Sequence, residues 1–395
     1  MKKRHYWLIL VIIAYGLIEL FSYGGLFLLV KLRRINYEPV DVLSNRHADI
    51  IDRFIREETN YVLFSSTLGW SIKENGTSRL YQSNSSGIRS DKEYALHPPR
   101  GILRVSTFGD SFTHCSDVKN GETWQAFMES YDSNLEVINF GVGSYGLDQA
   151  YLRYLEDGRQ YRSHIVLIGF MSENIYRNVN TFRPFYFSNA GIPLAKPRFE
   201  IKSEKLSLIP NPLYRLDDYK MLLLYPQEVL SKLGVNDYYY QKRYKSNMLD
   251  WSPTVRLIRI LLYKVSHKLS QQTIVINGRY NENSEAFIVT KKIFDEFYET
   301  AINNRSVPII LIFPNKVDII QYLRQKEKRY SPLLSYFNTR GYKHIDLMDA
   351  FENTDIKASF VGYHYSPLAN MLVAKHVHNY LKKLGVSSRV RQRRH

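Results

Sequence analysis

Four short segments of the chain hold residue types that could act together on an acyl group. They are Gly109-Asp-Ser111, Phe140-Gly-Val-Gly-Ser-Tyr-Gly146, Gly169-Phe-Met-Ser-Glu-Asn174 and Gly362-Tyr-His-Tyr-Ser-Pro367. A serine hydroxyl becomes nucleophilic near neutral pH when a base lies beside it, and the ordinary pKa of histidine, about 6.5, suits that base. A tetrahedral intermediate needs fixed N–H donors, which a glycine backbone or an asparagine amide can supply. Taken alone, Gly-Asp-Ser is also the pattern of a turn followed by a helix N-cap.

The elements around these segments alternate between strand and helix. Apolar runs predict strands at 102–108, 135–140, 165–170, 308–313 and 344–347, and helical periodicity lies at 122–130, 147–159, 284–304, 317–340 and 366–384. This alternation predicts right-handed βαβ units and an α/β fold, a flavodoxin-like three-layer sandwich with a parallel sheet. All four segments follow strands or open the last helix, so we expect them at the carboxyl edge of that sheet.

With these four blocks in this order, the chain resembles the SGNH/GDSL hydrolase superfamily over residues 102–174 and 305–384. The resemblance implies that Ser111 is the nucleophile and His364 the general base. It also implies an oxyanion hole made by the Ser111 and Gly143 backbone N–H groups and the Asn174 side chain. We expect Asp110 to support the loop that holds Ser111 through hydrogen bonds.

One family feature is missing from the last block. The family places an aspartate two or three residues before the histidine, where this chain has Gly362 and Val361. Three interpretations stay open: a Ser–His dyad, a backbone carbonyl that orients the imidazole, or a carboxylate from elsewhere. The candidates for that carboxylate are Asp346, Asp349 and Asp355.

Each candidate site residue also has a structural interpretation. Gly143 could be a turn glycine, and Asn174 could be the N-cap of a following helical turn. His364 could be an ordinary surface histidine, since the chain contains eleven histidines. The four matches in family order favour the site.

The N-terminal segment predicts a membrane span. Apolar residues from Tyr6 to Val30 stand between Lys2-Lys-Arg4 and Lys31-Leu-Arg-Arg34. Twenty-five helical residues reach about 37 Å, and no A-x-A cleavage pattern precedes the basic stop. We expect an uncleaved single-pass anchor with the catalytic domain in the periplasm or outside the cell. Glu19 inside the span could face a partner helix or could be a tolerated neutral carboxyl.

The expected organisation is therefore a transmembrane anchor at 1–34, a β-rich lead-in at 35–101, an SGNH hydrolase-like domain at 102–385, and a basic tail at 386–395. An insertion at 175–283 breaks the strand–helix rhythm, and its length predicts a helical subdomain, since structureless loops of that size are uncommon.

Composition limits the partners. The net charge of +16 favours an anionic partner, but no zinc-finger spacing, RNP-like motif or Walker loop accompanies it, so we expect no nucleic acid. The single cysteine, Cys115, excludes an intrachain disulfide and cysteine-rich metal sites. We expect no metal and no cofactor.

The function that follows is a membrane-anchored serine ester hydrolase acting on an acylated cell-surface substrate. By resemblance, the substrate is an O-acetylated glycan, with an acylated lipid as the other possibility. An O-acetyltransferase would use the same residues and could take its acyl group from a membrane acyl-donor protein. A non-catalytic scaffold that binds glycan or lipid is the alternative from another class, favoured by the missing aspartate. Membrane lipids are expected partners in each case.

Overall fold

The computed structural model describes residues 2–32, 43–244, 248–269, 273–352 and 354–385. Its centre is a parallel five-stranded sheet with the strand order β11-β10-β5-β3-β4. Ranked along the chain, this is the order 2-1-3-4-5 of flavodoxin-like folds, so the predicted fold class is confirmed. The strands are β3 (Leu103–Phe108), β4 (Leu135–Asn139), β5 (Ile165–Met171), β10 (Val307–Phe313) and β11 (His344–Asp346).

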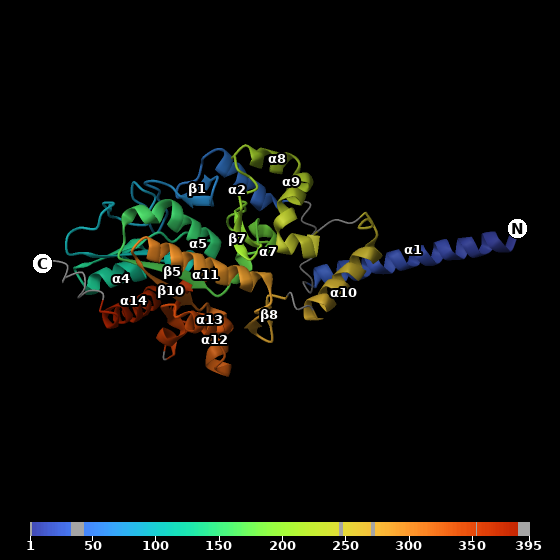
Figure 1. The fold of residues 1–395 in the computed structure, drawn as a ribbon. Coiled ribbons are helices and arrows are strands. Elements are labelled where there is room, and N and C mark those ends of the chain that lie inside the picture. Colours follow the sequence, from blue (N-terminus) through green and yellow to red (C-terminus); the bar gives the residue numbers. More distant parts are fainter. Residues whose placement is uncertain (1, 33–42, 245–247, 270–272, 353, 386–395) are drawn as a thin grey trace.

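The sheet is covered on both faces, which explains why β5 and β10 are continuously apolar. Every residue of β5 is buried, and β10 pairs with it over seven positions. The crossovers β3-β4 and β4-β5 run in opposite directions along the sheet, so right-handed connections place their helices on opposite faces. One face carries α4 (Trp124–Tyr131) beside α14 (Pro367–Lys383), and the other carries α5 (Leu147–Arg153) beside α11 (Glu285–Asn303) (Figure 1).

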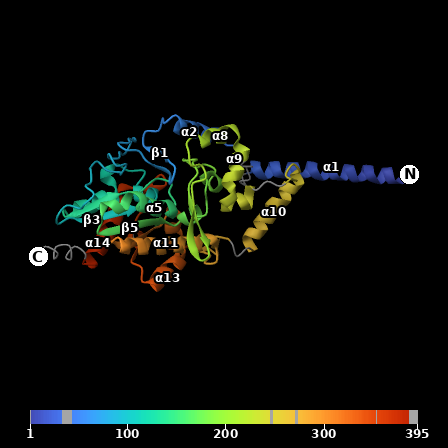
Figure 2. The same cartoon turned by 45° about the horizontal axis from the view of Figure 1, so that its top comes forward.

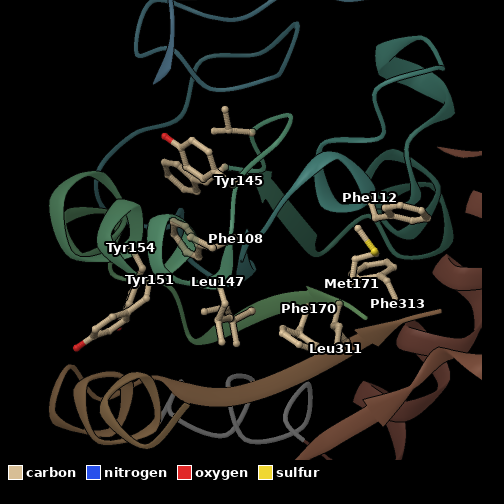
Figure 3. Packing of buried hydrophobic residues seen from close by; sticks show 14 of the residues in the cluster. Phe108, Phe112, Tyr145, Leu147, Tyr151, Tyr154, Phe170, Met171, Leu311 and Phe313 are labelled. Carbon is tan, nitrogen blue, oxygen red and sulfur yellow. The ribbon is translucent and has the colours of Figure 1, made fainter. Parts of the chain in front are cut away.

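Aromatic side chains fill the space between the sheet and its helices. Phe108 stacks on Phe140 with ring centroids 4.7 Å apart and contacts Tyr154 at 5.2 Å. Figure 3 shows Phe108 and Tyr154 on one side of this core, and Phe112, Met171 and Phe313 gathered near the ends of β5 and β10. This second group lies directly under the loop that holds Ser111.

The lead-in contains a helix that the turn-rich sequence did not predict. Helix α2 (Asn45–Ile55) begins after Ser44, whose side chain accepts a hydrogen bond from the His47 backbone N–H, and it buries Ile51 and Phe54. The antiparallel hairpin of β1 (Val62–Ser65) and β2 (Gly69–Ile72) follows, and Trp70 in β2 is fully buried. The lead-in is thus a helix in contact with α8 (Asp218–Leu224) plus a small hairpin whose Trp70 contacts the loop after β4.

The insertion is largely helical but also contains strands. Its helices are α6 (Asn174–Arg177), α7 (Arg183–Tyr186), α8 (Asp218–Leu224), α9 (Pro226–Leu233) and α10 (Pro253–Leu269). A hairpin of β6 (Arg198–Lys202) and β7 (Lys205–Ile209) covers a stretch that reads as turns in the sequence, and a shorter hairpin joins β8 (Val275–Ile276) to β9 (Arg279–Tyr280). Pro226 separates α8 from α9, because a proline in a helix interior has no backbone N–H to donate and its ring clashes with the preceding turn.

The helix predicted at 317–340 is two helices. Helix α12 (Lys316–Gln325) ends where Lys326 takes the left-handed conformation, with φ 56°, and α13 (Ser331–Arg340) begins with Pro332 in its first turn. Proline fits a first turn and not a helix interior, so the single-helix prediction was wrong at this point.

Helix α1 (Lys2–Lys31) projects away from the body of the molecule, with α10 beside it in both views (Figures 1 and 2). Its segment Lys3–Leu29 is long and apolar enough to cross a membrane. The basic residues at 33–34, the start of the predicted lead-in at 35–42 and the predicted basic tail at 386–395 lie outside the described residues.

Candidate functional site

Ser111 lies at the carboxyl end of β3, on the short helix α3 (Ser111–His114). Asp110 is the N-cap of α3, and its Oδ1 accepts a hydrogen bond from the Phe112 backbone N–H at 2.9 Å. Gly109 makes the sharp strand-to-helix passage possible, because a Cβ there would lie 2.1 Å from the Thr113 hydroxyl. The serine is therefore held at the sheet edge by its own local backbone.

His364 comes from the other end of the chain. It lies in β13 (His364–Tyr365), which pairs antiparallel with β12 (Phe360–Val361). The ring of Phe112, the residue after Ser111, contacts the His364 ring at a centroid distance of 5.5 Å and the Tyr365 ring at 4.8 Å. The structure thus packs the first and last blocks of the sequence against each other at one edge of the sheet.

A carboxylate holds the imidazole, and it comes from a position that sequence reasoning missed. His364 Nδ1 lies 2.7 Å from Oδ2 of Asp117, six residues after Ser111. The hydrogen bond from His364 is the main reason why the pKa of Asp117 is lowered, so this carboxylate is ionised. Because Nδ1–H donates to Asp117, Nε2 is the nitrogen that can accept a proton. Gly362 permits the approach, since a Cβ there would lie 3.1 Å from Asp117 Oδ2.

The three carboxylates named from the sequence are occupied elsewhere. Asp346 accepts hydrogen bonds from Lys328 Nζ and Tyr330 Oη, each at 2.7 Å. Asp349 lies 3.3 Å from the same lysine, and Asp355 accepts from the Lys357 backbone N–H. None of the three lies beside His364; of the interpretations left open, a carboxylate from elsewhere in the chain is the one the structure shows, and it is Asp117. The sequence signal that could have identified Asp117 is its position, a carboxylate six residues after Ser111 in the loop before the next helix.

Gly143 lies in the loop after β4, opposite the segment that follows α3. Its carbonyl accepts a hydrogen bond from Trp70 Nε1 at 3.0 Å. A Cβ built on Gly143 would meet only the Ser116 hydroxyl, at 3.7 Å, so packing does not require glycine at this position. Its backbone therefore faces a relatively open region, and the lead-in fixes its orientation.

Asn174 is the first residue of α6, after the carboxyl end of β5, and it is fully buried. Its N-cap interpretation is wrong, because the residue at that position is Glu173. The Asn174 side chain interacts with Asp110, and this hydrogen bond acts to lower the pKa of that carboxyl against the effect of burial. Asn174 is therefore placed beside the residue that precedes Ser111.

Two carboxylates and two guanidiniums surround this edge. Burial raises the pKa of Asp110, while Arg177, whose Nη1 lies 3.4 Å from Oδ2, opposes that rise. Burial also acts to raise the pKa of Glu173, but the positive charges of Arg177 and Arg183 outweigh the effect of burial, so the pKa of Glu173 is lowered overall. Burial and the neighbouring Arg177 lower the pKa of Arg183 to about 9. The buried charges therefore compensate one another near Ser111.

Arg89 of the lead-in holds the loop that carries Asp117 through hydrogen bonds. Arg89 donates from Nη1 to the carbonyls of His114 and Cys115 and from Nη2 to the carbonyl of Val118, the last two at 2.6 Å. These carbonyls bracket Asp117 on both sides. A buried guanidinium that satisfies three backbone acceptors fixes the loop backbone, and with it the position of the carboxylate.

His114 supports the same loop as a neutral side chain. Its Nδ1 faces Arg89 Nη1 at 3.2 Å, and arginine can only donate, so Nδ1 accepts and Nε2–H points to the Tyr61 hydroxyl at 2.8 Å. Burial, together with Arg89, lowers the pKa of His114 well below its usual value.

This histidine should make the fold less stable in mild acid. Below about pH 6.5 the unfolded chain takes up a proton that the folded chain refuses, so the free energy of unfolding falls by up to about 1.4 kcal/mol per pH unit. Urea unfolding of detergent-solubilised protein between pH 7.5 and pH 5 measures this slope. The slope should decrease in His114→Gln and stay unchanged in His376→Gln, a partly exposed histidine on α14. Equal slopes in both variants would contradict the assignment.

No metal site accompanies these residues: among the described residues, no group of three histidine, cysteine, aspartate or glutamate side chains is placed to hold an ion.

Comparisons with known proteins find likeness at the level of structure. No family model and no curated protein matches the sequence. A member of the lipolytic protein G-D-S-L family from Veillonella parvula is similar at a TM-score of 0.33 and 12% identity, covering 69% of this chain and 94% of its own. A GDSL-like lipase from Bacteroides thetaiotaomicron gives 0.33 and 10%, covering 71% and 89%. An alpha/beta hydrolase from the metagenome of Lake Arreo gives 0.35 and 10%, covering 70% and 93%.

The G-D-S-L family that the four sequence blocks resemble thus recurs among the solved structures to which this chain is similar. At these scores the likeness establishes no shared activity, and the chemistry of this chain follows from the geometry of its own site.

Proposed function

We propose that this chain is a serine ester hydrolase in which Ser111, His364 and Asp117 form the catalytic triad. The observation that carries the proposal is the 2.7 Å contact between His364 Nδ1 and an ionised Asp117, on a hairpin that packs against the residue next to Ser111. This contact supplies the orienting carboxylate that the last sequence block lacks. It also leaves Nε2 to serve the hydroxyl of a serine at the sheet edge.

In the proposed mechanism, Ser111 Oγ attacks the carbonyl carbon of an ester while His364 Nε2 takes the hydroxyl proton. Asp117 stabilises the imidazolium that forms. The tetrahedral intermediate then expels the alcohol, which leaves with the proton from Nε2, and an acyl-enzyme remains. Water then attacks the acyl-enzyme and gives a proton to His364 Nε2. The second tetrahedral intermediate releases the acid, and Nε2 returns the proton to Ser111 Oγ.

The developing negative charge would be held by the backbone N–H groups of Ser111 and Gly143 and by Asn174 Nδ2. The position of Asn174 supports this role, because it is buried at the start of α6, at the same sheet edge as Ser111, and interacts with Asp110, the residue before the nucleophile. Trp70, by holding the Gly143 carbonyl, would keep the adjoining peptide directed into the site. Asp110 would keep α3, and hence the Ser111 N–H, in place.

The membrane anchor and the substrate class belong to the same proposal. A helix of the length and apolar character of α1 would hold the catalytic body at a membrane surface, with that body in the periplasm or outside the cell. We propose an O-acetylated glycan as the substrate, with an acylated lipid as the other class. Transfer of the acyl group to a sugar hydroxyl, from a membrane acyl-donor protein, is the second candidate within the same chemistry.

The non-catalytic scaffold is the candidate from another class, and the missing aspartate before His364 favoured it. The contact between Asp117 and His364 removes that reason, because it offers the imidazole a carboxylate from another part of the chain.

Product analysis tests the proposal. Purified protein is incubated with an O-acetylated oligosaccharide and with a second, unacetylated oligosaccharide as acceptor, and mass spectrometry follows both. Free acetate that disappears in Ser111→Ala supports hydrolysis, whereas an acceptor gaining 42 Da, about one acetyl group, supports transfer. If neither free acetate nor acetylated acceptor forms, with acetylated glycans and with acetylated lipids as substrates, an enzymatic role on acetyl esters is contradicted.

A further inference from the structure

Glu19 of the apolar helix α1 has a partner within this chain. Its Oε1 accepts a hydrogen bond from the Ser252 hydroxyl at 2.6 Å, and its Oε2 accepts from the Thr254 backbone N–H at 3.2 Å. Both donors stand at the start of α10, where helix N–H groups lack intrahelical acceptors. A carboxylate placed at a helix N-terminus is favourable electrostatically, so Glu19 acts as a cap for α10.

Two more contacts fix α10 along α1. The Thr254 hydroxyl donates to Ser22 Oγ at 2.8 Å, and Leu257 lies 3.8 Å from the position of a Cβ on Gly25. Glu19, Ser22 and Gly25 are three residues apart and share one face of α1. Helix α10 therefore begins beside Glu19 of α1 and diverges from α1 toward its far end, as Figure 2 shows.

This arrangement sets the depth of α10. Glu19 lies ten residues before Leu29, the end of the apolar span, which is about 15 Å along the helix. If α1 crosses a membrane, the start of α10 lies at the same depth inside the hydrocarbon. Half of the bilayer core is about 15 Å thick, so α10 begins near its middle.

The surface that α10 presents agrees with that environment. Its side chains Ile258, Leu261, Leu262 and Val265 are exposed in the structure, by 49%, 52%, 61% and 53%. Just before the helix, Met248, Leu249 and Trp251 are exposed as well. These residues continue the exposed apolar surface of α1, and a large exposed apolar patch signals an interaction surface.

The charged residues near the start of α10 are paired. Arg259 forms an ion pair with Asp250, and Arg256 donates from Nε to the Asp250 backbone carbonyl. Glu19, Asp250, Arg256 and Arg259 carry two negative and two positive charges, so the charges near the start of α10 balance, while Lys264 and Lys268 lie in its second half. Ionisable groups inside a membrane are tolerated when they pair with one another or with backbone groups.

We infer that α10 and the residues just before it enter the membrane beside α1, and that lipid acyl chains cover their exposed apolar side chains. The inference rests on the proposed membrane anchor, since it is the depth of α1 that places α10 in the bilayer. It adds a second membrane-embedded element, which returns the chain from the bilayer to the catalytic body and limits how that body can turn about α1.

Depth-dependent quenching tests the inference on the full chain in phosphatidylcholine–phosphatidylglycerol vesicles. A single cysteine is introduced as Leu262→Cys and labelled with a small fluorophore. The native Cys115 is buried and should not compete for the label. Lipids brominated on their acyl chains serve as the quencher. Phe21→Cys on α1 is the control for the anchor, and Val317→Cys on α12, exposed on the catalytic body, is the control outside the bilayer.

We expect both the Leu262 and the Phe21 labels to lose emission, while the Val317 label loses none. The Phe21 label should respond most to bromines deep in the acyl chains and the Leu262 label most to bromines near the headgroups, because Leu262 lies nine residues, about 13 Å, beyond the start of α10. Quenching at Phe21 without quenching at Leu262 would overturn the inference and leave the anchor standing. Absence of quenching at both would overturn the anchor and the inference together. Cross-linking between copies through an unquenched Leu262→Cys would show that a second chain, and not lipid, covers the face.

A second variant tests the tie between the helices. In Glu19→Ala the Leu262 label should lose most of its quenching, while the Phe21 label keeps its own. Unchanged quenching of the Leu262 label would contradict the role of Glu19 as the residue that holds α10 in the membrane.

Discussion

Replacing Ser111 by alanine is expected to lower kcat/KM for an acetyl ester by about 10⁴–10⁶-fold, because no acyl-enzyme can form without the hydroxyl. The loss should appear in kcat at saturating substrate. The fold should survive, since the change removes one oxygen atom and leaves the Asp110 cap of α3 in place. Spectrophotometric assays with an aryl acetate measure the rate, and circular dichroism checks the fold.

Ser130→Ala is the matched control, a serine exposed on α4 whose hydroxyl bonds only within its own helix. It should keep the wild-type rate. If Ser111→Ala retained more than a few per cent of the activity, a different nucleophile would be at work and the proposed mechanism would be wrong.

Asp117→Asn is expected to lower kcat by about 10³–10⁴-fold with little change in KM or in folding, by analogy with triads whose aspartate is replaced by its amide. An asparagine amide facing His364 Nδ1 favours the tautomer that carries its proton on Nε2, and that nitrogen can then no longer accept the serine proton. Asp117→Glu should recover part of the loss, because it restores a carboxylate at a slightly different reach. Steady-state kinetics on the three proteins measure the effect.

The control for this prediction is Asp355→Asn, a change at one of the carboxylates that the sequence alone made a candidate. Its Oδ1 accepts from the Lys357 backbone N–H, and an asparagine oxygen can keep that bond. The rate should stay near the wild type. Equal losses in both variants would mean that the carboxylates act through general stability and not through His364.

The central sheet was predictable because its strands are buried on both faces. The continuous apolar runs of β5 and β10 carry this signal locally, and the alternation with helices then limits the topology to a few arrangements. Errors arose where one residue interrupts a periodic pattern. Pro332 divides 317–340 although the apolar spacing continues across it.

The site was predictable only as far as its blocks are local. Ser111, Gly143 and Asn174 each follow a strand, so the shared carboxyl edge brings them to the same side of the sheet. Asp117 could not be assigned in this way, because its partner His364 lies at the other end of the chain and the contact depends on how the β12–β13 hairpin packs on Phe112. Spatial pairs of this kind are not encoded in spacing.

The same reason kept Glu19 undecided. A carboxylate inside an apolar helix predicts a partner, but nothing in the sequence marks the start of α10, more than 200 positions away, as that partner. The helix α10 itself lies in an insertion whose apolar and basic residues, taken locally, suit a packed subdomain equally well.

The most direct test of the central claim is to map the adduct of a fluorophosphonate, which reacts with serines activated by a histidine base. Tryptic mass spectrometry of the labelled wild-type protein should find the phosphonate on Ser111, and labelling at that residue should be slowed strongly in His364→Ala and in Asp117→Asn. Absence of any adduct on Ser111 under conditions where the folded protein hydrolyses an ester, or labelling that persists at the same rate in both variants, would contradict the proposed triad.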